Sequence, residues 1–275
     1  MCPNDINIYR SIETEVLDTI TESSTIKTLR LKPKEELTFA TGQFIELTIP
    51  GIGEAPFTPS SNPSVKDTME VTIMKAGKVT AKVHELKKGD IVGLRGPYGV
   101  GYPLDHFKGK QILVLGGGVG LAPLRSLLYA LFDRIKDFQK IYFRYGAKTP
   151  QDIIYKKEIE QWSKRNELDF LLTVDGCDES WKGHVGLVTT ILDNMDIEHN
   201  KAVAIVCGPP VMMKFSTFKL LKLGFKEENI YLSMEKNMSC GLGKCGHCRL
   251  GTYYACKDGP VFTFDKIKAF PNIWD

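Results

Sequence analysis

Four of the 7 cysteines in this chain lie between Cys240 and Cys256, and this clustering limits what the chain can fold into. Either disulfide bonds or a metal or iron-sulfur centre would explain it. A chain of 275 residues can bury a large core, so it does not need the disulfides that stabilise small secreted domains. The odd cysteine count, and residues 1–16 without a basic and apolar leader, favour a reducing compartment. We therefore expect a cytoplasmic protein whose clustered cysteines bind a metal centre.

The spacing of the four cysteines favours an iron-sulfur cluster over zinc. Cys240-x4-Cys245-x2-Cys248-x7-Cys256 begins with the C-x4-C-x2-C pattern of plant-type 2Fe-2S loops, in which a fourth cysteine lies further along the chain. The glycines between these cysteines would let the loop bend tightly and turn its backbone amides towards the sulfurs. Structural zinc sites usually combine two short Cys-x2-4-Cys pairs, so zinc, with His247 as a spare ligand, is the alternative.

The remaining cysteines and histidines show no pattern that marks catalysis. Cys2 and Cys177 are expected to be inert thiols. Four histidines have no carboxylate or cysteine at a spacing typical of acid-base chemistry, so we expect surface or structural roles for them. They are His84, His106, His184 and His199. The sequence therefore predicts no catalytic side chain.

A glycine-rich turn in the middle of the chain indicates a nucleotide site. The segment KQILVLGGGVGLAPLRSLLYAL reads as an apolar strand at 112–115, a turn, and a helix with Pro123 in its first turn. Glycines let the backbone approach a pyrophosphate, and the amides at a helix start favour its negative charge. The turn departs from the strict G-x-G-x-x-G pattern, so taken alone it fits a purely structural turn equally well. The glycines of the turn are Gly116, Gly117, Gly118 and Gly120.

The segments after this turn complete an α/β unit. KIYFRYGAK and DFLLTVDG read as further strands, and KAVAIVCGPPVMMKFSTFKLL reads as a strand, a turn at 207–210 and a helix. Alternating strands and helices predict a parallel sheet, whose ligand crevice lies at the carboxyl ends of the strands.

The first hundred residues predict a small antiparallel β-barrel. Short alternating stretches (TIKTLRLKP, QFIELTIPG, MEVTIMKAG and DIVGLRGP) are separated by Gly, Pro and Asn turns, with one short helical candidate, KVTAKVHEL. The predicted fold class is thus an antiparallel β-barrel at 1–108, an α/β domain with a parallel sheet at 109–235, and a small C-terminal 2Fe-2S loop segment at 236–275.

Along almost its whole length the chain resembles the ferredoxin-NADP reductase superfamily. The resembling segments are GQFIELTIPGIGEAPFTPSS, AGKVTAKVHELKKGDIVGLRGPYGVGYPLD, GGGVGLAPLRSLL, CGPPVMM and MSCGLGKCGHC. Within it, the chain is similar to the iron-sulfur branch, which holds the electron-transfer subunit of dihydroorotate dehydrogenase, the gamma subunit of sulfhydrogenases and one of the subunits of anaerobic sulfite reductase. The resemblance implies that the barrel binds FAD and that the α/β domain binds NADH or NADPH.

The resemblance also implies particular flavin contacts. The superfamily motif R-x-[YF]-[ST] falls on residues 55–58, so Phe57 would pack on the flavin ring and Thr58 would donate a hydrogen bond. Ala55 stands where the motif has its arginine. A second segment, whose amides would receive the diphosphate, contains Gly77, Val79 and Thr80. From the residues alone, Phe57 fits a core aromatic and Thr80 fits a helix cap.

The same resemblance places the nicotinamide nucleotide. Residues 116–120 and Pro123 would hold its phosphates. Cys207, Gly208 and Pro209 would lie where the nicotinamide meets the flavin, with Cys207 as a positioning contact because hydride transfer to a flavin needs no covalent step. The segment YGAKTPQD has no serine-arginine cluster for a 2'-phosphate, which favours NADH, although Lys148 could serve NADPH.

The function implied by the resemblance is that of an electron-transfer subunit with diaphorase activity. Electrons would move between NAD(P)H, FAD and a 2Fe-2S cluster to or from a partner, in either direction. The partner would be a catalytic subunit of hydrogenase, sulfite reductase, heterodisulfide reductase or dihydroorotate dehydrogenase type, because the sequence contains no site for hydrogen, sulfite or orotate. A stand-alone reductase of ferredoxin and a non-catalytic zinc-binding assembly module are the alternatives.

Charge and hydropathy argue against a nucleic-acid ligand and against a membrane span. The net charge is +3, and 36 basic residues are interspersed with 33 acidic ones, so nucleic acid is not expected as a ligand. No run of residues approaches the roughly 18 consecutive apolar residues of a membrane span.

Overall fold

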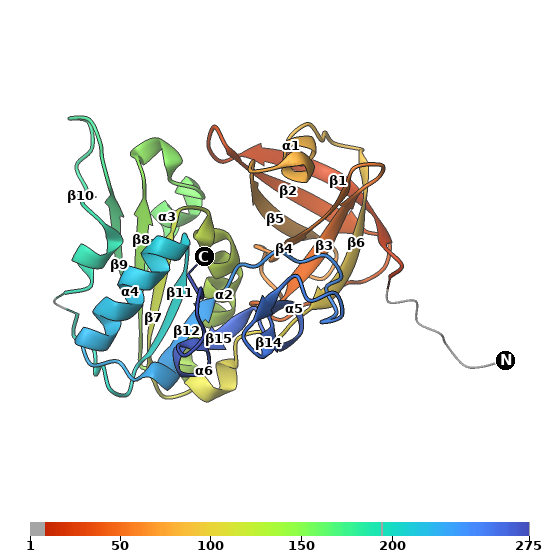
Figure 1. Cartoon of the computed structure of the whole chain (residues 1–275). Helices are drawn as coiled ribbons and strands as arrows, with labels where there is room; N and C mark the ends of the chain where they lie inside the picture. The colour runs from red at the N-terminus through yellow and green to blue at the C-terminus, as the bar shows by residue number, and fades with distance from the viewer. Residues whose placement is uncertain (1–8, 194, 275) are drawn as a thin grey trace.

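Alternating strands build the first part of the molecule, which is a closed antiparallel barrel (Figure 1). The computed structural model describes residues 9–193 and 195–274. The sheet has the order β4-β3-β6-β1-β2-β5, and a bridge between Pro59 and Val71 joins its two edges. Its strands are β1 (Ile12–Thr21), β2 (Ile26–Pro33), β3 (Phe44–Ile49), β4 (Gly53–Phe57), β5 (Met69–Met74) and β6 (Ile91–Tyr98).

The barrel core follows from the period of two along each strand. In β3, Ile45 and Leu47 point inwards and are fully buried in the barrel. Phe44 and Glu46 point outwards, yet both are buried, because another part of the chain covers this face. The helix α1 (Lys78–Val83) contacts β3, β4 and β5. The antiparallel barrel predicted from the sequence is therefore confirmed.

The second part is a seven-stranded sheet with helices on both faces. Its strand order is β10-β9-β8-β7-β11-β12-β15, parallel except for β15. The strands are β7 (Gln111–Gly117), β8 (Lys140–Ala147), β9 (Leu168–Val174), β10 (His184–Val185), β11 (Val203–Cys207), β12 (Ile230–Ser233) and β15 (Val261–Thr263). The helices are α2 (Leu121–Asp133), α3 (Lys156–Trp162), α4 (Pro210–Lys222) and α6 (Phe264–Ile267).

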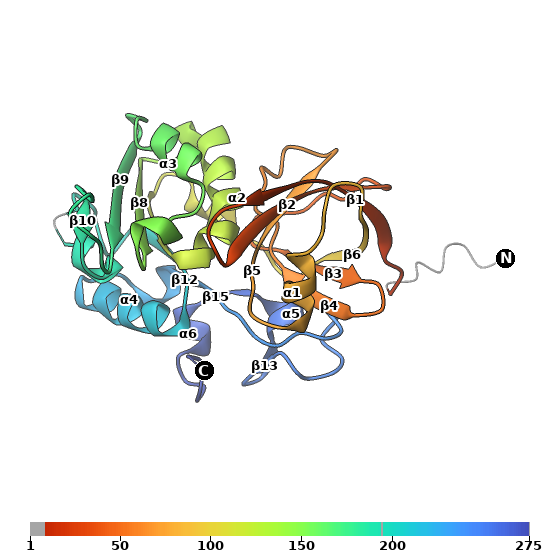
Figure 2. The ribbon, with the colours of Figure 1, turned by 90° about the horizontal axis from the view of Figure 1, so that it is seen from above.

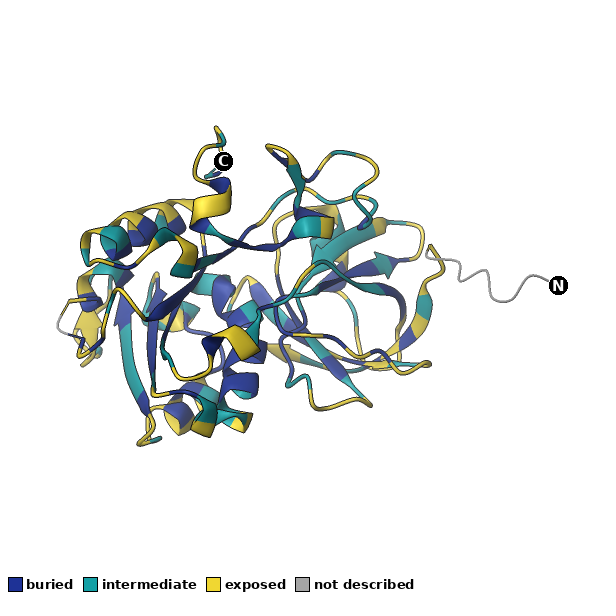
Figure 3. Ribbon diagram, turned by 90° about the horizontal axis from the view of Figure 1, so that it is seen from below, coloured by how far each residue is buried: buried dark blue, intermediate teal, exposed yellow. Residues whose placement is uncertain are grey.

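The order of the strands reverses between β7 and β11, and this reversal fixes where a ligand can enter. From β7, the strands β8 and β9 are added one after the other on one side of the sheet, and β11 and β12 are added on the other side. Helices α2 and α3 cover one face, and α4 and α6 cover the other (Figure 2). The buried strands between these layers are coloured dark blue in Figure 3. In open α/β sheets the crevice outside the carboxyl ends at such a reversal is where ligands bind.

The cysteine-bearing segment is an excursion between two neighbouring strands of this sheet. The chain leaves at the end of β12, forms β13 (Arg249–Leu250), β14 (Tyr253–Tyr254) and α5 (Ala255–Asp258), and returns as β15 beside β12. On the way it packs against the outer face of the barrel, where Val100 and Pro260 form a bridge. None of the helices in the described residues combines the length and apolar character that crossing a bilayer requires.

A buried arginine connects the barrel to the α/β domain. Arg125 of α2 is only 7% exposed and pairs with Glu70 of β5 at 2.5 Å and with Glu158 of α3 at 2.6 Å. Its guanidinium also lies 4.4 Å from the ring centroid of Tyr155, whose hydroxyl bonds to Thr72 of the barrel. Because these partners come from both parts, Arg125 fixes how the two parts meet.

Replacing Arg125 with Met should therefore lower the free energy of unfolding by about 3 kcal/mol, since two carboxylates would lose their buried cation. The matched control is Arg10→Met, which removes an exposed ion pair with Glu35 worth less than about 1 kcal/mol. Calorimetric melting of the three proteins makes the comparison. Equal melting temperatures for both variants would contradict the role given to Arg125.

Candidate functional site

One cavity of about 650 Å³ lies where the barrel, the α/β domain and the cluster segment meet. Its volume falls within the range of ligand pockets in proteins, roughly 300–1,000 Å³. The barrel contributes residues 56–58 and 72–74, the α/β domain contributes the starts of α2 and α4, and the C-terminal segment contributes 233–238 and His247. A ligand in this cavity would contact all three parts of the molecule.

The structure brings five of the thirteen predicted cofactor residues into the wall of this cavity. These five are Phe57, Thr58, Thr80, Pro123 and Cys207. Phe57 and Thr58 lie at the end of β4, across the cavity from the start of α2. The other eight do not line the cavity and lie at the start of α1, at the end of β7 or in the turns after β7 and β11. They are Gly77, Val79, Gly116, Gly117, Gly118, Gly120, Gly208 and Pro209.

Thr80 closes the turn that precedes α1. Its hydroxyl accepts hydrogen bonds from the amides of Ala76 at 2.9 Å and Gly77 at 2.8 Å, and lies 3.0 Å from the Gly77 carbonyl. These bonds hold residues 76–80 in a compact turn whose side chains at Ala76 and Thr80 face the cavity. Thr80 is thus the third residue of α1 and bonds back to the N-cap residue Gly77, so it is not the N-cap that the residues alone suggested.

Close backbone contact explains the glycines of the two loops at the strand reversal. Cys207 at the end of β11 pairs in register with Gly116 of β7, so the turns that follow both strands must pass each other. A Cβ on Gly120 would lie 2.5 Å from the Cys207 carbonyl oxygen, and one on Gly208 would lie 2.9 Å from the Met212 sulfur. The turn glycines thus let the two loops interlock, which is the structural role that the sequence pattern left open beside a nucleotide site.

Cys207 and Glu235 face the same end of the cavity. The Cys207 thiol is 2% exposed, and burial raises its pKa to about 12, so it stays protonated at neutral pH and is a poor nucleophile. Glu235 keeps exposed surface, but its carboxyl group lies against the cavity wall, and burial raises its pKa. Sequence reasoning missed Glu235, since a single glutamate after a short strand forms no recognisable pattern.

The cysteine loop directs backbone amides at its sulfurs. The Sγ of Cys240 accepts from the amides of Leu242 at 3.3 Å and Lys244 at 3.4 Å, and Cys256 Sγ accepts from Gly243 at 3.0 Å. Burial acts against ionisation of Cys240, but these amide contacts, with that of Cys245, lower its pKa to about 6. Amides aimed at sulfur stabilise thiolates, so this loop fits the ligands of an iron-sulfur cluster.

The four sulfurs lie as two pairs in the described residues. Cys248 and Cys256 are buried with their sulfurs 3.2 Å apart, and Cys240 contacts Cys245 through its side chain. Within residues 9–193 and 195–274, no three metal-binding side chains converge on one point. His247 bonds to Ser239 at 2.7 Å through Nδ1 and faces the cavity. The four thiols thus lie on one loop as two separate pairs, and their joint ligation of a cluster stays a prediction.

The barrel supports this loop through an arginine that the sequence analysis did not identify. Arg95 of β6 makes a two-point contact with Glu54 at 2.6 and 3.0 Å, donates to the Tyr98 hydroxyl at 3.1 Å, and reaches the Cys240 carbonyl at 3.5 Å. The bond from Arg95 lowers the pKa of Glu54. Tyr98 in turn packs on Gly241, where a Cβ would lie 2.9 Å from its ring. The cluster loop is therefore held at a fixed place on the barrel.

Glu46 is an unusual member of this supporting surface. It is 0% exposed, and neither of its carboxyl oxygens has a hydrogen-bond partner among the described residues. Burial raises its pKa to about 7, despite the opposing field of Arg95. A buried carboxyl group without a donor favours its neutral form, so the charge balance beneath the loop depends on Arg95 and Glu54.

The remaining described thiols and histidines do not line the cavity. Cys177 is exposed, and Cys2 lies outside the described residues. His84 bonds to the carbonyl of Ile73 at 3.0 Å, and His199 packs edge-on against Phe225. Both are structural contacts.

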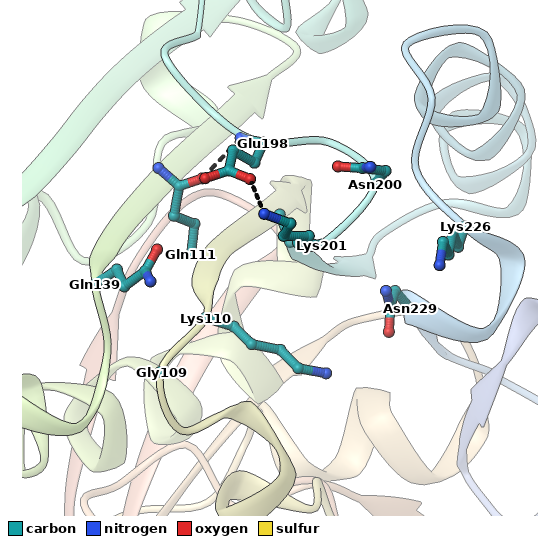
Figure 4. A pocket seen from close by; sticks show the side chains of 10 residues that line it. Gly109, Lys110, Gln111, Gln139, Glu198, Asn200, Lys201, Lys226 and Asn229 are labelled. Carbon is teal, nitrogen blue, oxygen red and sulfur yellow. Dashed lines mark hydrogen bonds and ion pairs between the residues drawn. The ribbon is translucent and has the colours of Figure 1, made fainter.

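A second hollow, of about 420 Å³, lies at the opposite edge of the sheet (Figure 4). It is lined by polar residues at the amino ends of the strands, among them Lys110, Gln111 and Lys201. Lys201 pairs with Glu198 at 2.7 Å, and the Glu198 amide donates to Gln111 at 2.7 Å. Ligand crevices of parallel sheets lie at the carboxyl ends, so the cavity at the strand reversal remains the candidate site.

Comparison with known families assigns a domain to each part of the chain. The oxidoreductase FAD-binding domain matches residues 12–102, and the oxidoreductase NAD-binding domain matches residues 114–217. The iron-sulfur cluster binding domain of dihydroorotate dehydrogenase B matches residues 235–268. Fold, cavity and cysteine loop together define an FAD- and NAD-binding oxidoreductase with an iron-sulfur centre, so the zinc alternative is not supported.

Relatives narrow this class to one family. The gamma subunit of sulfhydrogenase 1 from Pyrococcus furiosus is 39% identical, with 100% of this chain and 98% of the relative covered. The probable electron transfer subunit of dihydroorotate dehydrogenase B from the same organism is 36% identical, with 86% of this chain and 84% of the relative covered. The chain belongs to the family that contains these two electron-transfer subunits, as the sequence resemblance predicted.

Solved structures agree with the fold. A chain of the NADH-dependent reduced ferredoxin-NADP oxidoreductase aligns with a TM-score of 0.74 and 26% identity, covering 93% of this chain and 91% of that one. The ferredoxin-NADP reductase from Neisseria gonorrhoeae, with a TM-score of 0.70 and 20% identity, covers 81% of this chain and 97% of that one. At that identity the likeness shows the fold alone.

Because the two loops are in close contact, we expect one added methyl group at Gly120 to weaken nucleotide binding. Gly120→Ala should raise the dissociation constant for NADH about tenfold, because backbone atoms must move and overpacking costs about 1–3 kcal/mol. Gly176→Ala is the control, since a Cβ there meets no atom within 4 Å. Titration of both variants with NADH measures the effect. Equal affinities would show that the loops tolerate separation.

Proposed function

We propose that the chain carries electrons between NADH and a partner catalytic subunit, through FAD and a 2Fe-2S cluster held by Cys240, Cys245, Cys248 and Cys256. The observation that carries this proposal is the single cavity lined by the barrel, the α/β domain and the cluster segment. The proposed parts are a flavin barrel at 1–108, a nucleotide domain at 109–235 and a cluster segment at 236–275. The direction of flow depends on the partner.

The residues around the cavity would have separate roles in binding the flavin, the nucleotide and the cluster segment. A flavin bound there can accept a hydride from NADH and release two electrons singly, which a one-electron cluster then carries. Phe57 and Thr58 would face the flavin ring, and residues 76–80 its diphosphate. The interlocked loops at Gly120 and Cys207 would hold the nucleotide with its nicotinamide towards the flavin. Met234 and His247 place the cluster segment against the same cavity.

The partner is proposed to be a hydrogenase-type catalytic subunit. The support is the sulfhydrogenase gamma subunit, to which the chain is similar along its whole length. A dihydroorotate dehydrogenase catalytic subunit is the second candidate, because the electron transfer subunits of that enzyme are also relatives. A cytoplasmic location forms part of the proposal and is supported by the described cysteines, which are all free thiols.

Replacing Cys248 with Ser should separate the two halves of the electron path. The cluster should be weakened or lost because an alkoxide matches iron-sulfur ligation less well than a thiolate. The flavin should remain and still be reduced by NADH, with electrons passing to a small dye. Transfer to the partner should collapse.

The measurements are iron analysis, EPR of the reduced protein, and the two electron-transfer assays. Cys177→Ser is the control, since that thiol is exposed and lies outside the cysteine loop, and it should behave as wild type. Folding must be checked because loss of a cluster can loosen residues 238–260. Zinc in place of iron, or full delivery to the partner without a cluster, would refute the assignment.

The nucleotide preference should favour NADH. Asp175 follows β9 and donates its amide to the carbonyl of Ala147 at the end of β8, beside Lys148. A carboxylate here would repel a 2'-phosphate, which carries a charge of the same sign. We expect kcat/KM to be about tenfold higher with NADH than with NADPH, and Asp175→Asn to reduce this ratio. Asp178→Asn, further along the same loop, is the control. Preference for NADPH in the wild type would contradict this prediction.

A further inference from the structure

An apolar stripe on the outer face of α4 has no role in the cofactor sites. It consists of Val211, Phe215 and Phe218, which recur at helical spacing and are 61%, 59% and 42% exposed. The opposite face of α4 is anchored in the core by Met213 and Leu220, which are 1% and 0% exposed. Exposed apolar surface of this kind, gathered on one face and bordered by polar residues, is typical of a protein contact.

The stripe borders a hollow rather than a flat surface. A depression of about 440 Å³ separates α4 from the short helix Val188–Ile191, and Phe215, Phe218 and Leu187 line it. Leu187 is itself 61% exposed. Hollows lined by aromatic side chains accept protruding anchors from a protein partner. A lipid surface, which is broad and has no fixed protrusion, would fill such a recess poorly.

The charges around the stripe indicate an acidic partner. The charged residues of α4 are all lysines, Lys214, Lys219 and Lys222. Lys219 pairs with Asp193 at 2.6 Å, so the border keeps a positive excess. In a two-fold self-association the same lysines of two copies would face each other, which like charges disfavour. Carboxylates around an apolar ridge on a different subunit would complement this border.

The stripe and the cysteine loop lie on the same side of the α/β sheet. Met213 and Leu220 of α4 share one buried core with Cys248, Ala255 and other residues of the cluster segment. Seen from above, α4 and the cluster segment follow one edge of the molecule, whereas α2 and α3 follow the opposite edge (Figure 2). A single partner surface can therefore contact both α4 and the loop that carries the cysteines.

We propose that the stripe Val211-Phe215-Phe218 and its flanking lysines dock the electron-accepting catalytic subunit and hold that subunit beside the cluster. This inference rests on the proposed function, which supplies the acceptor. The occupant is a protein surface with an apolar ridge that enters the hollow and carboxylates that meet Lys214 and Lys222.

The test uses the complex isolated through a tag on this chain. The acceptor is identified as the copurifying subunit that NADH reduces in the wild-type complex but not in the Cys248→Ser complex. Phe215→Asp should raise KM for the separated acceptor about tenfold or more, while NADH-dependent dye reduction, flavin content and iron content stay unchanged. Lys222→Glu should raise KM mainly at low salt, where exposed charges act most strongly. Val65→Asp, in the loop between β4 and β5 at a position that is 47% exposed, is the matched control and should leave KM unchanged.

An unchanged KM for the acceptor in Phe215→Asp would overturn the docking role. A second outcome would also overturn it: the wild type is a dimer, and Phe215→Asp converts it to monomers without changing KM. That result would assign the stripe to contact with a second copy of this chain. Binding of the wild type to anionic vesicles, lost in Phe215→Asp while KM is unchanged, would assign it to a membrane surface and also overturn the proposal. Failure of the wild-type chain to reduce a dye with NADH would overturn the proposed function itself, and that result is distinct from an intact diaphorase with normal acceptor kinetics.

Discussion

The close passage of two loops at the strand reversal is the contact on which the rest of the site depends. Register pairing sets Cys207 beside Gly116, and the absence of a side chain at Gly120 lets the following backbones touch. From this point α2 and α4 diverge to opposite faces of the sheet, and the space left at the carboxyl edge becomes the cavity. The barrel closes that cavity from one side, and the excursion after β12 closes it from another.

Two buried guanidinium groups fix the positions of the barrel, the α/β domain and the cysteine loop around the cavity. Arg125 joins α2 to the barrel through Glu70, and Arg95 joins the barrel to the cysteine loop through Cys240. Each bridges elements far apart in the chain, and each is nearly excluded from solvent, so loss of either leaves carboxylates without their cation. Electron transfer between cofactors requires fixed separations, and these contacts supply that rigidity.

Local patterns predicted most of the elements, because strand alternation, glycine turns and cysteine spacing are recorded within short segments. The strands around β2, β3, β5 and β6, the strand-turn-helix at 112–131 and the class of the cysteine loop are confirmed. The strands β1 and β4 were not predicted, because most of their residues are polar or only partly buried. The return of the chain as β15 beside β12 was also not predicted, since three residues carry no pattern of their own.

Two of the side chains that sequence reasoning missed, Arg95 and Arg125, have partners that are distant in the chain. Arg95 meets a carbonyl 145 residues away, and Arg125 meets a carboxylate 55 residues away. Ala55 stands where the motif has its arginine, and the guanidinium that reaches Glu54 of β4 comes from β6, on the far side of β3. The two ends of the cysteine-bearing excursion are themselves neighbours, because Ser233 and Val261 pair across β12 and β15. An insertion whose two ends are adjacent can be exchanged without disturbing the sheet from which it emerges. At this junction a reductase fold can therefore gain, lose or replace its iron-sulfur segment.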